Sequence, residues 1–402
     1  MKLSGIISRI KGLGKKTVSL LCRALPLQNM VVFNSFHGRG MADDPKYIAL
    51  ELLRRNTRIS LVWLVKDAKR AHLPAGILPV EYDSLKASFY MSLARVWVDN
   101  CRDMADKAMK RKGQFYIQTW HATLGLKKKG PENTKSSKRA RAKAIADAAA
   151  TDLMYSDNDV YVDFYKNKFW FQGTVLKCDQ PRVAYLFNHP EGLKAELCAR
   201  LGIPTDTRIA MYAPTFRDRD VNGFEVYDYD FERILQALEK VFGSGFTMLV
   251  RLHPNIRNSP ALGKFKFSPR VVDATFMPDM QELLCIADVL ITDFSSSMFD
   301  FAICRKPVFL VAKDYERYVA DDRELFVDPR KDLPFSFSDG EDELIAAIKS
   351  FDPVDYRKAC DGFFDSVGLR DQGRGDLVLA DLVESKMKSA PQSPLPQQGV
   401  PR

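Results

Sequence analysis

The sequence predicts an α/β protein built from two parallel β-sheets in two domains. Strand-like apolar runs alternate with helical patterns along nearly the whole chain, and 402 residues exceed what one hydrophobic core usually organises. Several of the predicted strands end in polar or histidine-containing loops. Two Rossmann-like sheets facing each other across a cleft would place these loops around it, where open α/β sheets bind their ligands.

The first sheet is expected from four apolar runs, at residues 30–33, 59–65, 95–99 and 115–120. A helix should follow the first strand from about Asp43 to Leu53. Asp43 and Asp44 would supply its acidic cap, and Pro45 suits its first turn.

The second sheet is expected from runs at residues 208–213, 247–252, 289–292 and 307–311. We therefore divide the globular chain into an N-terminal domain (29–200) and a C-terminal domain (201–388). The tail (389–402) is rich in proline and glutamine and should be disordered.

The first 28 residues are expected to form a basic amphipathic helix that associates with membranes. A helical wheel places seven residues on one narrow face with three basic residues opposite, and no acidic residue occurs in the first 30. These are Leu3, Ile7, Ile10, Gly14, Val18, Leu21 and Leu25, with Arg9, Lys16 and Arg23 opposite. Such a helix suits an anionic membrane surface; the alternative is an ordinary amphipathic helix packed on the protein body.

A second basic segment, residues 127–143, has a net charge of +7, and the chain outside these two segments has a net charge of −4. This segment contacts either a membrane or an anionic acceptor, or it is a solvated face. Because the positive charge is confined to two segments without interleaved aromatic residues, nucleic-acid binding is the least favoured function.

Composition excludes several other classes. The seven cysteines are scattered and lack CxxC spacing, as expected for reduced thiols in a cytosolic protein without a disulfide framework or zinc site. No apolar run approaches the ~18 residues of a membrane span, and no signal peptide is predicted. No Walker A, GxGxxG or metal-ligand spacing occurs, so the sequence requires no cofactor.

Two of the five histidines follow predicted strands and have basic neighbours. His121 lies in Gln118-Thr119-Trp120-His121, and His253 lies in Arg251-Leu252-His253-Pro254. Histidine transfers protons near neutral pH, so both are candidates for a reaction centre that handles an anion. The alternative for each is a structural histidine.

A phosphate-binding segment is predicted where the strand 289–292 leads into three serines and a helix. Backbone N–H groups and hydroxyls at such a helix start suit a phosphate or diphosphate, whereas a capping box of Ser297 and Asp300 would need no ligand. Thr215, Arg217 and Arg251, near the ends of neighbouring strands, add a hydroxyl and two cations suited to a nucleotide diphosphate.

In this order, the motifs resemble those of the CDP-glycerol:poly(glycerophosphate) glycerophosphotransferase family, the teichoic-acid polymerases and primases and their capsule-synthesis relatives. The resemblance extends from about Phe33 to Leu382. It rests on Ser35-Phe36-His37-Gly38 with Asp44-Pro45-Lys46-Tyr47-Ile48, Gln118-Thr119-Trp120-His121, Tyr212-Ala213-Pro214-Thr215, Arg251-Leu252-His253-Pro254, and residues 287–296 with Phe299-Asp300-Phe301-Ala302.

The resemblance implies a GT-B-like fold with an acceptor-side N-terminal domain and a C-terminal domain for the CDP-linked donor. It implies transfer of a polyol phosphate, here expected to be glycerol phosphate, to an acceptor hydroxyl with release of CMP. The motif histidines are essential in the family; we assign the general base to His121 and charge stabilisation to His253, and the reverse assignment stays open. The expected location is the cytoplasmic face of the cell membrane, as a peripheral protein.

The remaining site residues follow from the same resemblance and from the local patterns. Donor binding is predicted for Thr215, Arg217, Arg251, Asp293, Ser295, Ser296, Ser297 and Asp300, and acceptor- or membrane-side contacts for His37, Lys127, Lys128 and Lys129. The expected partners are a CDP-polyol donor, a lipid-linked or polymer acceptor and an anionic membrane surface. No metal ligands are predicted, although a Mg²⁺ ion carried by the diphosphate is compatible with the site.

The chain departs from the family pattern at Ala122, where glycine is common, at Phe294, where tyrosine is usual, and at Leu124-Gly125-Leu126. These departures bear on the donor polyol and the acceptor more than on the reaction type. Two alternatives stay open: a GT-B glycosyltransferase that uses a nucleotide sugar, and a non-catalytic membrane-surface binding protein.

Overall fold

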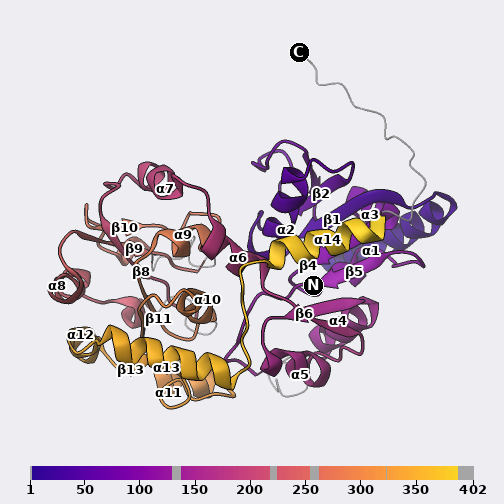
Figure 1. Cartoon of the computed structure of the whole chain (residues 1–402). Coiled ribbons are helices and arrows are strands. Elements are labelled where there is room, and N and C mark those ends of the chain that lie inside the picture. Colours follow the sequence, from indigo (N-terminus) through magenta and orange to yellow (C-terminus); the bar gives the residue numbers. More distant parts are fainter. Residues whose placement is uncertain (1, 129–136, 218–223, 254–261, 323, 388–402) are drawn as a thin grey trace.

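Two all-parallel β-sheets organise the computed structural model (Figure 1), which describes residues 2–128, 137–217, 224–253, 262–322 and 324–387. The first sheet has the strand order β3-β2-β1-β4-β5-β6-β7 and the second β10-β9-β8-β11-β12-β13. The strands are β1 (Gln28–Asn34), β2 (Ser60–Val65), β3 (Ile77–Glu81), β4 (Ala94–Asp99), β5 (Phe115–Gln118), β6 (Leu153–Ser156), β7 (Thr174–Lys177), β8 (Arg208–Tyr212), β9 (Phe246–Val250), β10 (Val271–Asp273), β11 (Val289–Thr292), β12 (Val308–Val311) and β13 (Ser336–Ser338).

Helices connect the strands and cover the faces of the sheets, as parallel sheets require. The helices are α1 (Lys2–Leu21), α2 (Asp43–Arg54), α3 (Leu85–Leu93), α4 (Lys138–Ala150), α5 (Asp159–Lys168), α6 (Pro181–Asn188), α7 (Leu193–Leu201), α8 (Phe231–Phe242), α9 (Met280–Ile286), α10 (Ser297–Ile303), α11 (Tyr315–Arg317), α12 (Glu341–Lys349), α13 (Pro353–Ser366) and α14 (Gly375–Met387).

The predicted strands are all present, and their ends differ from the prediction by at most two residues. Five strands of three to five residues were not predicted from the sequence, namely β3, β6, β7, β10 and β13. The predicted helix after β1 is confirmed as α2. The predicted acidic cap of this helix is wrong, because the N-cap residue is Ala42, which makes no side-chain capping bond.

Helix α14 returns to the first sheet, although it falls within the range predicted for the C-terminal domain. Its Leu379 and Val383 share a buried core cluster with Val31 and Phe33 of β1. Figure 1 shows α14 beside α2. The first domain is therefore built from both ends of the chain.

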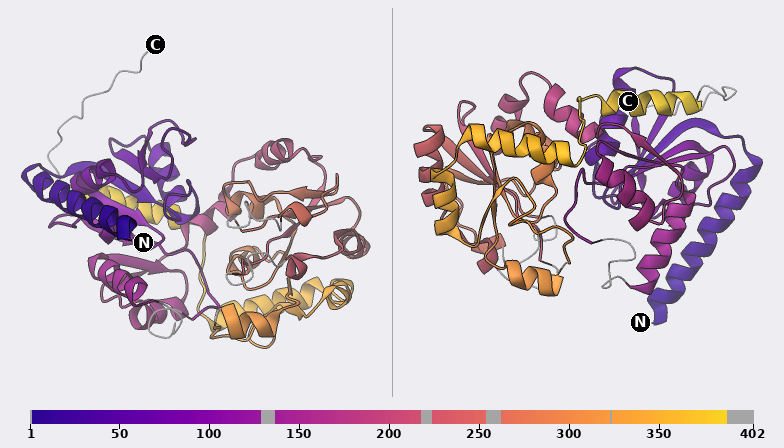
Figure 2. Two further views of the ribbon diagram at one scale, coloured as in Figure 1. Left: turned by 180° about the vertical axis from the view of Figure 1, so that it is seen from behind. Right: turned by 60° about the horizontal axis from the view of Figure 1, so that its bottom comes forward.

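Helix α1 is confirmed and packs along α3 on the outside of the first domain (Figure 2). Its Ser19 faces the protein body, and its hydroxyl accepts a hydrogen bond from the Ser92 hydroxyl at 3.2 Å. Leu13, Leu20 and Leu21 are instead 68%, 52% and 70% exposed. The narrow face predicted from the helical wheel is thus divided, because Gly14 contacts the Leu85 side chain while Leu21 faces solvent. Among the described residues, no helix is long and apolar enough to cross a membrane.

The two domains share a continuous hydrophobic core. Ala122 and Leu124, after β5, belong to the same buried cluster as Phe294 and Met298, after β11. The segments that follow these strands therefore meet at the interface between the domains, which brings the two motif regions of the sequence together.

Candidate functional site

His121 lies in the segment that leaves β5, and its imidazole is held at one nitrogen. Its Nδ1 lies 2.8 Å from the carbonyl oxygen of Asn100, so this nitrogen carries the hydrogen, and in the neutral ring Nε2 is the nitrogen able to accept a proton. The ring stacks on Trp120, with centroids 3.9 Å apart. Trp120 itself has φ +58°, an unfavourable value for a bulky residue that commonly marks a functional site.

The loop after β4, residues 100–103, organises the surroundings of His121. Besides binding His121, Asn100 accepts a hydrogen bond from the Phe36 backbone N–H at its Oδ1, at 2.9 Å. The Arg102 guanidinium lies 5.1 Å from the Trp120 ring centroid, in cation–π geometry. β1 and β4 are neighbours in the sheet, so the loops that leave their carboxyl ends meet. These two loops lie about 65 residues apart in the sequence.

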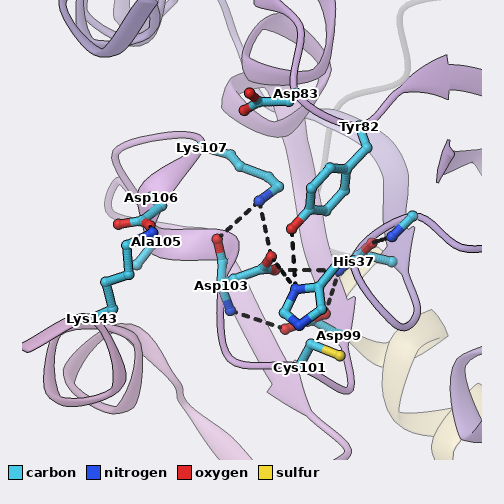
Figure 3. A network of polar contacts seen from close by, with 12 residues as sticks. His37, Tyr82, Asp83, Asp99, Cys101, Asp103, Ala105, Asp106, Lys107 and Lys143 are labelled. Carbon is cyan, nitrogen blue, oxygen red and sulfur yellow. Dashed lines mark hydrogen bonds and ion pairs between the residues drawn. The ribbon is translucent and has the colours of Figure 1, made fainter. Parts of the chain in front are cut away.

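His37 lies in a tight turn that leaves β1. Phe36, His37 and Gly38 have φ values of +46°, +59° and +75°, the left-handed region that costs a non-glycine residue about 1–3 kcal/mol. Two bonds enforce the turn, since the Gly38 N–H donates to Ser35 O and to Asn34 Oδ1, each at 3.0 Å. The turn directs the His37 side chain toward Asp103, as Figure 3 shows.

Asp103 anchors the His37 ring. Its Oδ2 lies 2.8 Å from His37 Nδ1 and 3.1 Å from Lys107 Nζ, and Lys107 in turn lies 3.8 Å from the Tyr82 ring centroid. Burial alone would raise the pKa of the Asp103 carboxyl, but the hydrogen bond from His37 and the charge of Lys107 lower it below its ordinary value. Asp103 is therefore an anion that orients the imidazole.

Arg217 and Asp293, both predicted to bind the donor, form a buried ion pair behind the second-domain site. Arg217 Nη1 donates to Asp293 Oδ2 at 2.8 Å, and its Nε and Nη2 each donate to Asp314 at 2.8 Å. Because Arg217 is only 2% exposed and bonded on both sides, the geometry supports a positioning role. Asp293 Oδ1 also accepts a bond from the Thr215 N–H at 2.8 Å, which fixes the turn after β8.

The three serines after β11 do not form the capping box that the sequence allowed. Ser297 Oγ shares a 2.8 Å hydrogen bond with Ser295 Oγ, and the N-cap residue Ser296 makes no capping bond. The Thr215 hydroxyl is buried without a hydrogen-bond partner among the described residues. The Thr215 hydroxyl is thus unused by the described part of the fold, whereas the Ser295 hydroxyl is already bonded to Ser297.

His253 and Arg251 lie directly after β9. The His253 ring stacks on Phe216 with centroids 5.4 Å apart, and the Arg251 N–H donates to Tyr212 O at 2.8 Å. Both side chains are partly exposed. His253 is therefore placed beside the segment after β8 that carries Thr215, as the sequence analysis expected for strand ends of one sheet.

Asp300, also predicted to bind the donor, lies in the domain interface. Its carboxylate accepts bonds from Arg182 Nε at 2.8 Å and from Thr123 Oγ1 at 2.7 Å. Arg182 Nη1 reaches back to Asp44 Oδ2 of α2 at 2.6 Å. Asp300 is 4% exposed, so its observed contacts join the two domains.

Lys127 and Lys128, predicted on the acceptor or membrane side, lie against the second domain. Lys127 forms an antiparallel bridge with Leu325, and the Lys128 N–H donates to Glu324 O at 2.9 Å. Lys129 lies outside the described residues. Among the described residues of the second basic segment, the exposed basic side chains are those at the start of α4.

The sequence analysis missed Asn100, Asp103, Arg182 and Asp314. None of them belongs to a recognisable local motif, and each acquires its role from a contact with a distant segment. Within the described residues, no group of three or more histidine, cysteine or carboxylate side chains is arranged to hold a metal ion. All seven cysteines are described and are free thiols.

The chain is similar to known teichoic-acid polymerases and transferases. The profile of the CDP-glycerol:poly(glycerophosphate) glycerophosphotransferase family matches residues 18–374. A teichoic acid poly(glycerol phosphate) polymerase of Staphylococcus epidermidis is 29% identical over 369 residues, covering 89% of this chain and 51% of the relative. A teichoic acid glycerol-phosphate transferase of Staphylococcus aureus is 29% identical, covering 84% and 87%. The chain spans about half the length of the first of these relatives and of a similar polymerase of Bacillus subtilis.

Solved structures agree with this result. The wall teichoic acid polymerase TagF is 26% identical and superposes with a TM-score of 0.81, covering 96% of each chain. A TagF histidine variant soaked with CDPG also has a TM-score of 0.81 over the same coverage. Together with the two parallel sheets, this similarity shows that the chain has the GT-B-like α/β fold.

Proposed function

The chain belongs to the CDP-glycerol:poly(glycerophosphate) glycerophosphotransferase family, and on that premise we propose that it transfers glycerol phosphate from CDP-glycerol to an acceptor hydroxyl. CMP is the second product. The acceptor is a lipid-linked or polymeric chain that ends in a hydroxyl group. The observation that carries this proposal is the His121 imidazole, which is tethered at Nδ1 and keeps Nε2 as a proton acceptor at the carboxyl end of the first sheet.

In the proposed reaction, His121 Nε2 removes the proton of the acceptor hydroxyl. The hydroxyl oxygen forms a bond to the distal phosphorus of the donor, and the bond between that phosphorus and the bridging oxygen breaks. The electron pair leaves with CMP. The Asn100 carbonyl keeps the hydrogen on Nδ1 and stabilises the imidazolium that forms at His121.

The second domain supplies the electrostatic part of the proposed mechanism. His253 and Arg251 lie on one segment, and Thr215, Ser295 and Ser296 lie after neighbouring strands of the same sheet. These groups offer hydrogen bonds and positive charge to a diphosphate, whose negative charge grows on the leaving CMP. Arg217 and Asp293 hold the segments that carry these groups in place.

No residue of this mechanism requires a cofactor. A Mg²⁺ ion bound by the donor diphosphate would, together with His253 and Arg251, offset the negative charge of the diphosphate. Activity measured with and without EDTA separates the metal-dependent and metal-independent forms of the proposal.

In the same proposal the chain works as a peripheral protein at the cytoplasmic face of an anionic membrane. The supporting surface is α1, where Leu13, Leu20 and Leu21 are exposed beside the basic residue Lys16. An apolar strip next to basic side chains is typical of helices that lie in the headgroup region. The lipid-linked acceptor would then reach the first domain from the membrane.

The test is CMP release from CDP-glycerol and from CDP-ribitol in the presence of membrane-derived acceptor. We expect release by the wild type, loss of at least about 10²-fold with either His121→Ala or His253→Ala, and wild-type rates with His189→Ala, which removes an exposed histidine. Turnover of a UDP-sugar without CMP release would show a glycosyltransferase instead. Binding of vesicles without turnover of any donor would show a non-catalytic protein.

A further inference from the structure

A cluster of polar side chains in the first domain has no part in the proposed mechanism. Figure 3 shows this cluster, which consists of His37, Tyr82, Asp103 and Lys107. His37 is anchored on one side only. Its Nδ1 lies 2.8 Å from Asp103 Oδ2 and 3.3 Å from Tyr82 Oη, whereas Nε2 makes no hydrogen bond to any described residue. The His37 side chain is 50% exposed, so the ring presents Nε2 to solvent in a fixed orientation.

The cluster fixes which nitrogen of the His37 ring faces solvent. Asp103 accepts the Nδ1–H, so a second proton on the ring would be carried by Nε2 and would point to solvent. Lys107 balances the charge of Asp103 at 3.1 Å. Arg39, exposed two residues later, adds a cation to the same loop.

Two of the other carboxylates labelled in Figure 3 are already paired with cations, Asp83 with Lys15 and Asp106 with Lys143. Asp99 lies fully buried behind the cluster, where its Oδ1 accepts a hydrogen bond from Asn34 Nδ2 at 2.6 Å. The accessible part of the cluster is thus the Nε2 edge of His37.

The position of His37 is linked directly to that of His121. Asn100 binds His121 Nδ1 through its backbone carbonyl and binds the Phe36 N–H through its side chain. The Phe36 ring centroid lies 5.9 Å from that of His121. His37 therefore follows, by one residue, the side chain that borders the proposed base.

We propose that His37 is an acceptor-specificity residue that takes up a proton from solvent when the acceptor binds and then donates its Nε2–H to a phosphate-ester anion of the acceptor. This inference rests on the proposed function, because that function supplies an acceptor chain built of polyol phosphates. The left-handed turn at His37 then has a purpose, since it holds the ring against Asp103 at the edge of the site. In this arrangement the reacting hydroxyl of the acceptor lies at His121, and the neighbouring phosphate of the acceptor binds His37.

The kinetic test compares His37→Gln, which keeps a hydrogen-bonding side chain but no charge, with His37→Arg, which restores a cation. His72→Gln removes another exposed histidine of the same domain and serves as the control. CMP release is measured with a glycerol-phosphate-terminated acceptor and with a phosphate-free polyol acceptor. We expect His37→Gln to raise the KM for the phosphate-bearing acceptor at least tenfold, with kcat and the KM for CDP-glycerol within twofold of wild type. His37→Arg should recover most of this loss.

Several results would overturn the assignment. Equal effects of His37→Gln on both acceptors would mean that the phosphate is not recognised there. A rise in the KM for CDP-glycerol in place of the acceptor KM would assign the cation to the donor phosphate. Failure of His37→Arg to recover activity, with an unchanged melting temperature, would leave only a structural role.

A binding measurement separates this inference from the proposed function. In protein labelled with ¹⁵N-histidine, sn-glycerol 3-phosphate should shift the His37 ring signal in a saturable manner, identified by its absence in His37→Gln, and glycerol should not. No shift with glycerol 3-phosphate would refute the site even if the enzyme releases CMP. A shift in a protein that releases no CMP from either CDP-polyol would instead refute the reaction and keep the anion site.

Discussion

Replacing Arg182 by methionine removes a side chain that bonds carboxylates of both domains in the buried network around α6. In the native structure its guanidinium binds Asp44 of the first domain at 2.6 Å and Asp300 of the second at 2.8 Å. All three side chains are almost completely buried. Arg182→Met keeps an unbranched stem up to the position of Nε but removes the guanidinium, which leaves both carboxylates without their cation.

Removing one partner of a buried ion pair usually costs about 3–5 kcal/mol, because the remaining charge stays desolvated. Protonation limits this cost, since burial already raises the pKa of Asp44 above its ordinary value even with Arg182 present. We therefore expect a loss of about 4 kcal/mol, which corresponds to a fall in Tm of roughly 8–16 °C for a unit of about 200 residues.

The loss should grow with pH. Without Arg182 the Asp44 carboxyl keeps a proton that the unfolded chain releases, so raising the pH favours unfolding. Urea unfolding of wild type and Arg182→Met at pH 6 and pH 8 measures both effects. Arg200→Met is the matched control, because it removes an exposed ion pair with Glu196 at 3.6 Å and a weak contact with Met277 Sδ at 3.9 Å, and it should cost less than about 1 kcal/mol.

The reasoning fails if Arg182→Met loses no more stability than Arg200→Met. It also fails if the loss is the same at both pH values, because the buried carboxyls would then not take up protons. A transition that divides into two steps only in Arg182→Met would add that this residue couples the unfolding of the two domains.

Three further predictions follow from the same structure. Gly38→Ala should lower the free energy of unfolding in urea by about 2–3 kcal/mol, because φ is +75° and a Cβ would lie 2.8 Å from a neighbouring side-chain carbon. The control Gly362→Ala, inside α13 with open space around it, should raise that free energy by about 0.5–1 kcal/mol. Equal effects of the two variants would contradict the argument from backbone conformation. The free energy of unfolding should decrease from pH 5 to pH 8, because burial raises the pKa of Asp147 and of Asp157 to about 7 each and the unfolded chain gives up those protons first; a rising profile would refute this sign. Leu20→Glu on α1 should lower cosedimentation with anionic vesicles at least severalfold without changing Tm, and unchanged binding would remove α1 from the membrane proposal.

The architecture was predictable from the sequence because the central strands carry long apolar runs. β1, β2 and β4 are nearly continuous stretches of buried valine, leucine and tryptophan, which is the signature of parallel strands covered on both faces. β7 has no fully buried residue and lies at the edge of its sheet, so neither composition nor periodicity marks it. The return of α14 to the first sheet has no local sequence signal either.

The candidate site was predictable where it follows a strand, and not where it depends on a contact between loops. His121 and His253 are placed by the ends of β5 and β9, which the sequence shows. The bond from His121 to Asn100 exists because β4 and β5 are neighbours in the sheet, an order the sequence does not state. Asp300 was expected near the donor because it follows the serines, yet its position on α10 turns it toward Arg182.

Because α14 completes the core over β1, the first domain is interrupted in sequence by the whole of the second. A ribosome therefore finishes the residues of the second sheet before it supplies the last helix of the first. Until residues 375–387 have emerged, the nascent first domain exposes the apolar groove that Leu379 and Val383 later fill. The second domain can consequently fold first, and the core of the first domain is completed only when α14 has been synthesised.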